Sequence, residues 1–123
     1  MKFLCLCHYD LEAFGKLGPA DFGEIGRICA PHDAALKASG KVSLIGSLGM
    51  PDRFKTLRAD SSGVSLDDGP YEATNEPFGA FFIVEADSID EAVEIARLHP
   101  GTHLGHVMKG GIEVRPIDQL ETL

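Results

Sequence analysis

The chain has 123 residues, which suits one domain with a single hydrophobic core. Hydrophobic residues make up 44% of it and charged residues 24%, a balance that excludes a chain too polar to fold. The net charge of −8 makes nucleic acid and anionic membranes poor partners, so we expect neither. Without an apolar run as long as a membrane span or signal-peptide core, and with three cysteines that suit a reducing compartment, we expect a cytoplasmic protein.

The first third of the chain predicts a strand, a loop and a helix. Met1 to Tyr9 is the strand, and its consecutive apolar residues indicate burial on both faces. Asp10 to Pro19 has the glycine and proline content of a loop, with its final proline suited to open a helix. The following segment has apolar residues at helical spacing up to Gly40, and Pro31 predicts a kink or break near Ala30.

The middle of the chain is typical of strands and tight turns. Lys41 to Leu48 has β character. Phe54 to Ala59 and Val64 to Leu66 flank a short polar link with a glycine, which predicts a hairpin. Asp68-Gly69-Pro70 then indicates a sharp turn, in which we expect the Asp68 side chain to hydrogen-bond its own backbone.

The last third predicts a strand, a helix and a final strand. Ala80 to Val84 is an unbroken apolar run that should lie centrally in the sheet. Ser88 and Glu91 have capping-box spacing, and apolar residues follow at helical intervals. The helix should stop near His99, because the next residue is proline, and Ile112 to Arg115 forms the last strand.

The order β, α, β, β, β, β, α, β favours an α+β fold of ferredoxin-like type, with an antiparallel sheet and two helices on one face. Two helices cover only one face of a sheet. Because Phe3 to Cys7 and Phe81 to Val84 place apolar side chains on both faces, the second face needs a cover. We therefore expect a homodimer in which two sheets pack face to face.

Four motifs together identify a family resemblance. They are Asp68-Gly69-Pro70-Tyr71, Gly79-Ala80-Phe81-Phe82, His99-Pro100 and the segment Gly111 to Ile117. With them the chain resembles the YCII-related family, in the branch named for a D-G-P-F motif. The likeness covers a single domain over residues 1–118 and leaves 119–123 as a C-terminal tail.

The resemblance implies a dimeric α+β barrel. It implies a mostly unassigned activity, with one branch that resembles lyases removing chloride from chlorinated hydroxyquinones and some members thought to accompany alternative sigma factors. Two positions depart from the family pattern: Tyr71 stands where Phe is frequent, and Asn75 where Lys is frequent. The second change removes a charge from the stretch after the motif.

The resemblance also implies a catalytic pair. Members with a proposed site pair a histidine of the first helix with an aspartate after the second, and His32 matches the first position while His99 replaces the aspartate. Two imidazoles across one cleft could divide acid and base roles. A surface or helix-end histidine is the alternative for each.

Other candidates for chemistry have plainer alternatives. His99, His103 and His106 have ligand-type side chains, but a proline and a glycine interrupt the helix that would align them, so we expect loop histidines and no metal site. Cys5 and Cys7 share one strand face, opposite to His8, which favours buried thiols over thiol chemistry. No phosphate-binding glycine motif is present, and we expect no cofactor.

Asp68, Tyr71 and Arg115 are candidates for substrate binding. Asp68 lies beside the Tyr71 phenol, and Glu72 adds a second carboxylate on its other side, although the turn itself would account for the aspartate. Arg115 on the last strand could hold an anion, although a cross-strand or intersubunit ion pair is the better explanation.

Two functions remain open. The first is a homodimer that binds a small organic molecule in a cleft, with cofactor-free lyase or isomerase chemistry at a histidine. The second is a non-catalytic binding or regulatory module that acts through protein–protein contacts. Polar groups that converge in a cleft would favour the first, and a filled apolar interior would favour the second.

Overall fold

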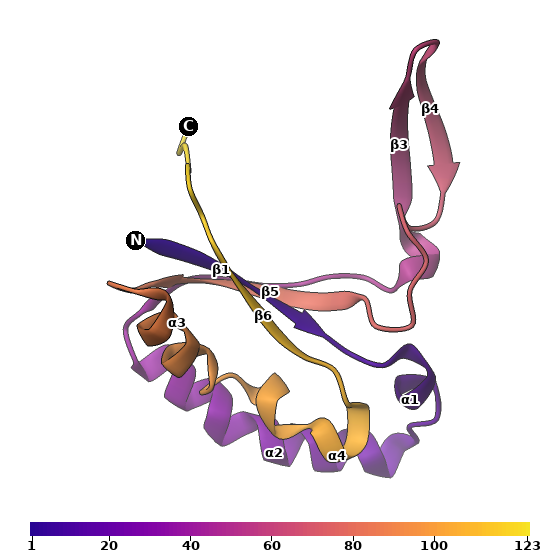
Figure 1. Cartoon of the computed structure of the whole chain (residues 1–123). Coiled ribbons are helices and arrows are strands. Elements are labelled where there is room, and N and C mark those ends of the chain that lie inside the picture. The colour runs from indigo at the N-terminus through magenta and orange to yellow at the C-terminus, as the bar shows by residue number, and fades with distance from the viewer.

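The computed structural model describes residues 1–123 and contains two sheets. Four strands pair antiparallel in the order β2-β5-β1-β6, which is the ferredoxin-like arrangement predicted from the sequence (Figure 1). These strands are β1 (Lys2–His8), β2 (Val42–Ser47), β5 (Phe78–Glu85) and β6 (Gly111–Pro116). The second sheet is a hairpin of β3 (Lys55–Asp60) and β4 (Gly63–Asp68).

The principal helices lie on one face of the four-stranded sheet (Figure 1). They are α2 (Pro19–Ala38), α3 (Ile89–Ala96) and the short α4 (Gly105–Met108). Ser88 caps α3 by accepting a bond from the backbone N–H of Glu91, as its capping-box spacing predicts. None of the helices has the length and apolar character needed to cross a membrane.

The hydrophobic core lies between the sheet and these helices. Phe82 and Val84 of the central strand β5 are fully buried, and so are Cys5 of β1 and Leu36 of α2. On the outer face, Leu6 pairs with Phe81 in the register of β1 and β5. Apolar side chains therefore occupy both faces of the central strands.

Helix α2 is continuous through Pro31, so the break near Ala30, one of the two outcomes that the sequence predicted, is wrong. Proline removes one N–H donor and so deprives the carbonyl four residues earlier, that of Arg27, of its helical bond. Arg27 is exposed, and water can hydrate that carbonyl. Packing of the helix through the fully buried Leu36 supplies stability that local propensity does not.

The β3–β4 hairpin rises from the sheet on the side opposite the helices (Figure 1). Leu57 pairs with Leu66, and Ala59 with Val64, so these four residues share one apolar face of the ribbon. Leu57, Val64 and Leu66 are 70, 69 and 63% exposed. The hairpin is as predicted, but no other part of the chain covers this face.

Two predicted loops contain short helices instead. Asp10 accepts a bond from the backbone N–H of Ala13 and thereby starts α1 (Leu11–Gly15). After α3, the 3-10 helix η2 (Pro100–His103) and then α4 replace the plain connector that the glycines suggested. The turn η1 (Pro51–Arg53) precedes the hairpin. The Asp10 side chain caps α1, and the His99 side chain caps η2. Such caps stabilise short helices, so a prediction of loops from glycine content was wrong in both segments.

Candidate functional site

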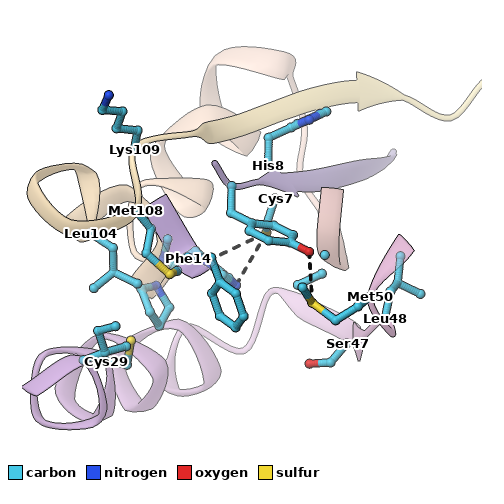
Figure 2. A pocket seen from close by; sticks show the side chains of 17 residues that line it. Cys7, His8, Phe14, Cys29, Ser47, Leu48, Met50, Leu104, Met108 and Lys109 are labelled. Carbon is cyan, nitrogen blue, oxygen red and sulfur yellow. Dashed lines mark hydrogen bonds between the residues drawn. The ribbon is translucent and has the colours of Figure 1, made fainter. Parts of the chain in front are cut away.

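A cavity of about 410 Å³ opens between the sheet and α2, beside the end of β1 (Figure 2). Mostly apolar side chains from β1, α1, α2, β5 and the segment around α4 line it. The lining residues that carry polar or sulfur atoms in their side chains are Cys7, His8, Tyr9, Cys29, Ser47, Met50, His99, Met108 and Lys109. A pocket of this size with a few polar groups suits a small organic molecule.

His99 is the best-fixed polar residue of this cavity. Its ring stacks on Phe82 with centroids 4.8 Å apart and an interplanar angle of 2°. Its Nδ1 accepts a bond of 2.9 Å from the backbone N–H of Gly101, which caps η2. An acceptor nitrogen carries no proton, so the neutral ring bears its hydrogen on Nε2.

Electrostatics keep His99 neutral. Burial lowers the pKa of His99 below its ordinary value, and the nearby Asp33 carboxylate opposes this only partly. Its Nε2 lies 3.7 Å from the sulfur of Cys7. Burial raises the pKa of Cys7 to about 12, with the neighbouring Cys5 adding to the shift, so the thiol stays protonated and is no nucleophile at neutral pH.

Tyr9 provides a second hydrogen-bond donor. Its hydroxyl donates to Sδ of Met50 at 3.3 Å, and its ring meets Phe14 edge to face at 5.6 Å. Burial raises the pKa of the Tyr9 phenol, which therefore keeps its proton. Tyr9 and His99 thus share one property: within the protein, each donor faces only a sulfur, which is a weak acceptor.

Of the two predicted catalytic histidines, only His99 lines this cavity. The His32 ring stacks on that of His103, with centroids 3.6 Å apart. His103 in turn contacts the Arg97 carbonyl oxygen through Nε2 at 3.2 Å. His106 lies on α4. The three histidines after α3 therefore face different surroundings.

The predicted substrate-binding residues also lie outside this cavity. Asp68 does not bond its own backbone as expected, since its carboxylate pairs with Lys55 across the hairpin. Other groups hold the turn: the Gly69 N–H donates to the Phe54 carbonyl at 2.7 Å, and the Thr56 hydroxyl donates to the Gly69 carbonyl at 2.8 Å. Arg115 pairs with Glu113 on its own strand. Tyr71 lines a second, adjoining cavity.

Comparison with known proteins decides the family. Residues 1–119 match the family described as the YCII-related domain. The chain belongs to this family. The resemblance inferred from the sequence motifs is thus confirmed over nearly the whole chain.

Two individual proteins are similar to this YCII-related chain. The uncharacterized protein R00369 of Rhizobium meliloti (strain 1021) is 25% identical over 121 residues, which cover 95% of this chain and 92% of that protein. A solved structure, 5-chloro-2-hydroxyhydroquinone dehydrochlorinase (TftG) from Burkholderia phenoliruptrix AC1100 in complex with 2,5-dihydroxybenzoquinone, is 23% identical. It covers 96% of this chain and 94% of its own, with a TM-score of 0.49.

Sequence reasoning missed several residues of the cavity. Tyr9 was assigned only to the end of a strand, and Met50 and Met108 were not considered. Their convergence depends on three segments far apart in the chain, and no local spacing reveals it. A weak signal was present for Tyr9, because a phenol at the end of a buried strand tends to place its hydroxyl at a cavity or a surface.

Proposed function

We propose that this protein binds a small, mostly apolar ring compound carrying a carbonyl oxygen in the cavity beside β1. One observation carries the proposal: the Tyr9 hydroxyl and the His99 Nε2–H line one cavity and have only sulfur partners in the protein. A ligand oxygen is a stronger acceptor than a thiol or thioether sulfur. Binding would therefore improve both hydrogen bonds.

The same donors support cofactor-free lyase or isomerase chemistry. A neutral imidazole and a phenol that donate to a carbonyl oxygen stabilise negative charge on that oxygen, which is the electrostatic contribution that such chemistry needs. His99 has the fixed orientation that this role requires. His32, ranked first from the sequence, would need to leave its stack on His103 to take part.

A matched pair of probes tests the binding mode. Acetophenone carries the carbonyl, and ethylbenzene has nearly the same shape without it. In an NMR titration, acetophenone should perturb the resonances of Cys7 and Met108 and bind at least about fivefold more tightly than ethylbenzene, the value of roughly one hydrogen bond.

Variants assign the donors. Tyr9→Phe and His99→Phe should each reduce acetophenone affinity about fivefold, and His32→Ala should leave it unchanged. Equal affinity for acetophenone and ethylbenzene would refute the proposal. A loss confined to His32→Ala would return the role to the residue favoured by the sequence.

We also propose that the protein is a homodimer formed through the outer face of the four-stranded sheet. Phe81 and Ile83 of β5 point to that face beside Leu44 of β2, which is 52% exposed. An apolar face of this kind is unfavourable in water. Light scattering at micromolar concentration should give twice 13.2 kDa, and Phe81→Asp should abolish the dimer. A wild-type mass of 13.2 kDa would exclude it.

A second candidate function, a non-catalytic protein-binding module, draws on the hairpin. Leu57, Val64 and Leu66 form an exposed apolar face on a ribbon that projects from the domain. The double variant Leu57→Ser, Leu66→Ser separates the two functions. Acetophenone binding that persists in this variant supports the first, whereas wild-type protein that binds none of the probes favours the second.

A further inference from the structure

A second cavity, of about 340 Å³, adjoins the first at His8 and Leu48. It lies where the end of β1 meets the turn before the hairpin and the segment after it. Its aromatic and proline residues are Pro51, Phe54, Pro70, Tyr71, Pro77 and Phe78. The proposed function leaves this cavity unused, although it contains part of the Asp-Gly-Pro-Tyr motif.

His8 is held in this cavity with a defined tautomer. Its Nδ1 lies 2.8 Å from the carbonyl oxygen of Glu76. A carbonyl oxygen only accepts, so Nδ1 carries the hydrogen, and in the neutral ring Nε2 has an available lone pair. Phe78 packs edge to face against the ring at 5.8 Å. In Figure 2 the His8 side chain points away from Phe14 and Cys29.

Tyr71 supplies a fixed aromatic wall. The guanidinium of Arg58 lies over its ring, 4.3 Å from the centroid, and also donates to the Tyr71 backbone carbonyl. The cation–π contact and the hydrogen bond hold the ring although Tyr71 is 68% exposed. Together with Phe54 and Phe78, it gives the cavity flat apolar walls of the kind that bind planar rings.

Charge restricts the ligand further. Glu72 and Glu76 are the charged residues that line the cavity, and no Lys or Arg side chain lines it. The Arg58 guanidinium on the Tyr71 ring lies outside the lining and is paired with Asp67, so it does not cancel the two carboxylates. These carboxylates repel an anion and favour a neutral or positively charged ligand. The Nε2 lone pair of His8 in turn needs a hydrogen-bond donor on the ligand.

We propose that this second cavity is a binding site for an aromatic compound that carries a phenolic hydroxyl and no negative charge. The hydroxyl donates to His8 Nε2, and the ring lies against the aromatic walls. The two cavities then have opposite preferences: the first offers donors to a carbonyl, and the second offers an acceptor to a hydroxyl. The site stands on its own geometry and does not require ligand binding in the first cavity.

Tyramine and 4-hydroxyphenylacetate form a matched pair of probes, since both carry a phenol and they differ in the sign of their charge. In NMR titrations of the full chain, tyramine should perturb the resonances of His8 and Tyr71 and bind at least fivefold more tightly than 4-hydroxyphenylacetate. Equal affinities, or perturbations confined to Cys29 and Met108 of the first cavity, would overturn the proposal.

His8→Asn tests the acceptor. The asparagine amide can still donate to the Glu76 carbonyl but has no group in place of Nε2, so tyramine affinity should fall at least fivefold while the melting temperature stays nearly constant. Unchanged affinity would overturn the proposal. If His8→Asn does not fold, Tyr71→Ala provides the second variant: this exposed wall residue should also cost at least fivefold, and no loss in that variant would count equally against the site.

Discussion

The four-stranded sheet and the β3–β4 hairpin are built from the same antiparallel pairing but differ in what covers them. Phe82 in the centre of the sheet is fully buried beneath the helices, whereas Leu57 on the hairpin is 70% exposed. The strands of the hairpin pair in a continuous register, and those of the sheet do so except for irregularities at Cys7/His8 of β1 and Val42/Leu44 of β2. The comparison shows that pairing sets the geometry of a strand, while a second layer supplies the burial that stabilises it.

The two cavities lie where these regions meet. The first uses the end of β1 and the helical layer, and the second uses the end of β1 and the segments that lead into and out of the hairpin. At this junction the side chains come from the sheet, the helical layer and the hairpin segments. They do not pack as one continuous layer, so space remains between them. The end of β1 positions His8 and the adjoining Tyr9, while the surrounding segments supply the walls.

Truncation of an apolar side chain should have very different effects in the two regions. Phe82→Ala should lower the free energy of unfolding by about 3–5 kcal/mol, because it leaves a cavity in the core and removes the stacking partner of His99. Leu57→Ala should change it by no more than about 0.5 kcal/mol. Urea denaturation of both variants measures these changes in the free energy of unfolding. Similar losses in the two variants would contradict the proposed difference between the sheet and the hairpin.

Glycine substitutions compare backbone constraints in the same two regions. Gly110 and Gly63 both have positive φ, 75° and 128°, so alanine at either costs about 1–3 kcal/mol in strain. A Cβ on Gly110 would also lie 2.0 Å from the carbonyl oxygen of His8, whereas nothing lies within 4 Å of one on Gly63. Gly110→Ala should therefore lower the melting temperature more than Gly63→Ala. The reverse order would show that the backbone at His8 moves at little cost to make room for the new methyl group.

The half-buried His99 should make stability depend on pH. Because burial lowers the pKa of His99 in the folded state, the unfolded chain binds a proton more readily near its ordinary pKa of about 6.5. The contribution of neutral His99 is complete above that pH and is lost as pH falls toward the lower folded pKa.

Unfolding experiments between pH 8 and 5 measure this slope. His99→Phe should flatten it relative to the wild type, and NMR titration of the His99 ring should give a pKa below that of a model peptide. A wild-type slope that the substitution leaves intact would assign the acid sensitivity to another group.

The smallest effect is expected at the base of the hairpin. Asp68 is paired with Lys55, and both side chains are exposed, 83% and 66%. An exposed pair contributes about 0–1 kcal/mol, so Asp68→Ala should shift the melting temperature only slightly. The shift should vanish at 1 M salt, where charges are screened. A large shift that persists in salt would restore the role in the turn that the sequence suggested.

Much of the fold was predictable because local and long-range signals agree. The apolar run Ala80 to Val84 marks a central strand that is apolar on both faces, and Ser88 marks the start of a helix whose apolar residues face the sheet. The break predicted at Pro31 is absent because the proline removes only one backbone hydrogen bond, whereas packing through Leu36 stabilises α2 as a whole.

The candidate site was less predictable, because its residues meet through tertiary structure. The family resemblance points to His99 through its place after α3, but its presence in one cavity with Tyr9 depends on β1 pairing with β5, whose Phe82 stacks on the His99 ring. His8 was set aside because alternation turns it away from Cys7. Its orientation depends on the carbonyl of Glu76, 68 residues away, and no local pattern contains that contact.

The position of β1 in the sheet has a consequence for how the chain folds. This strand, Lys2–His8, is the first to emerge during synthesis, yet its neighbours are β5 and β6, the last two strands. Each pairing closes a loop of most of the chain, and such distant contacts slow folding. Until Gly111–Pro116 is available, the apolar residues of β1 remain without their partners, so folding on the ribosome waits for the end of the domain.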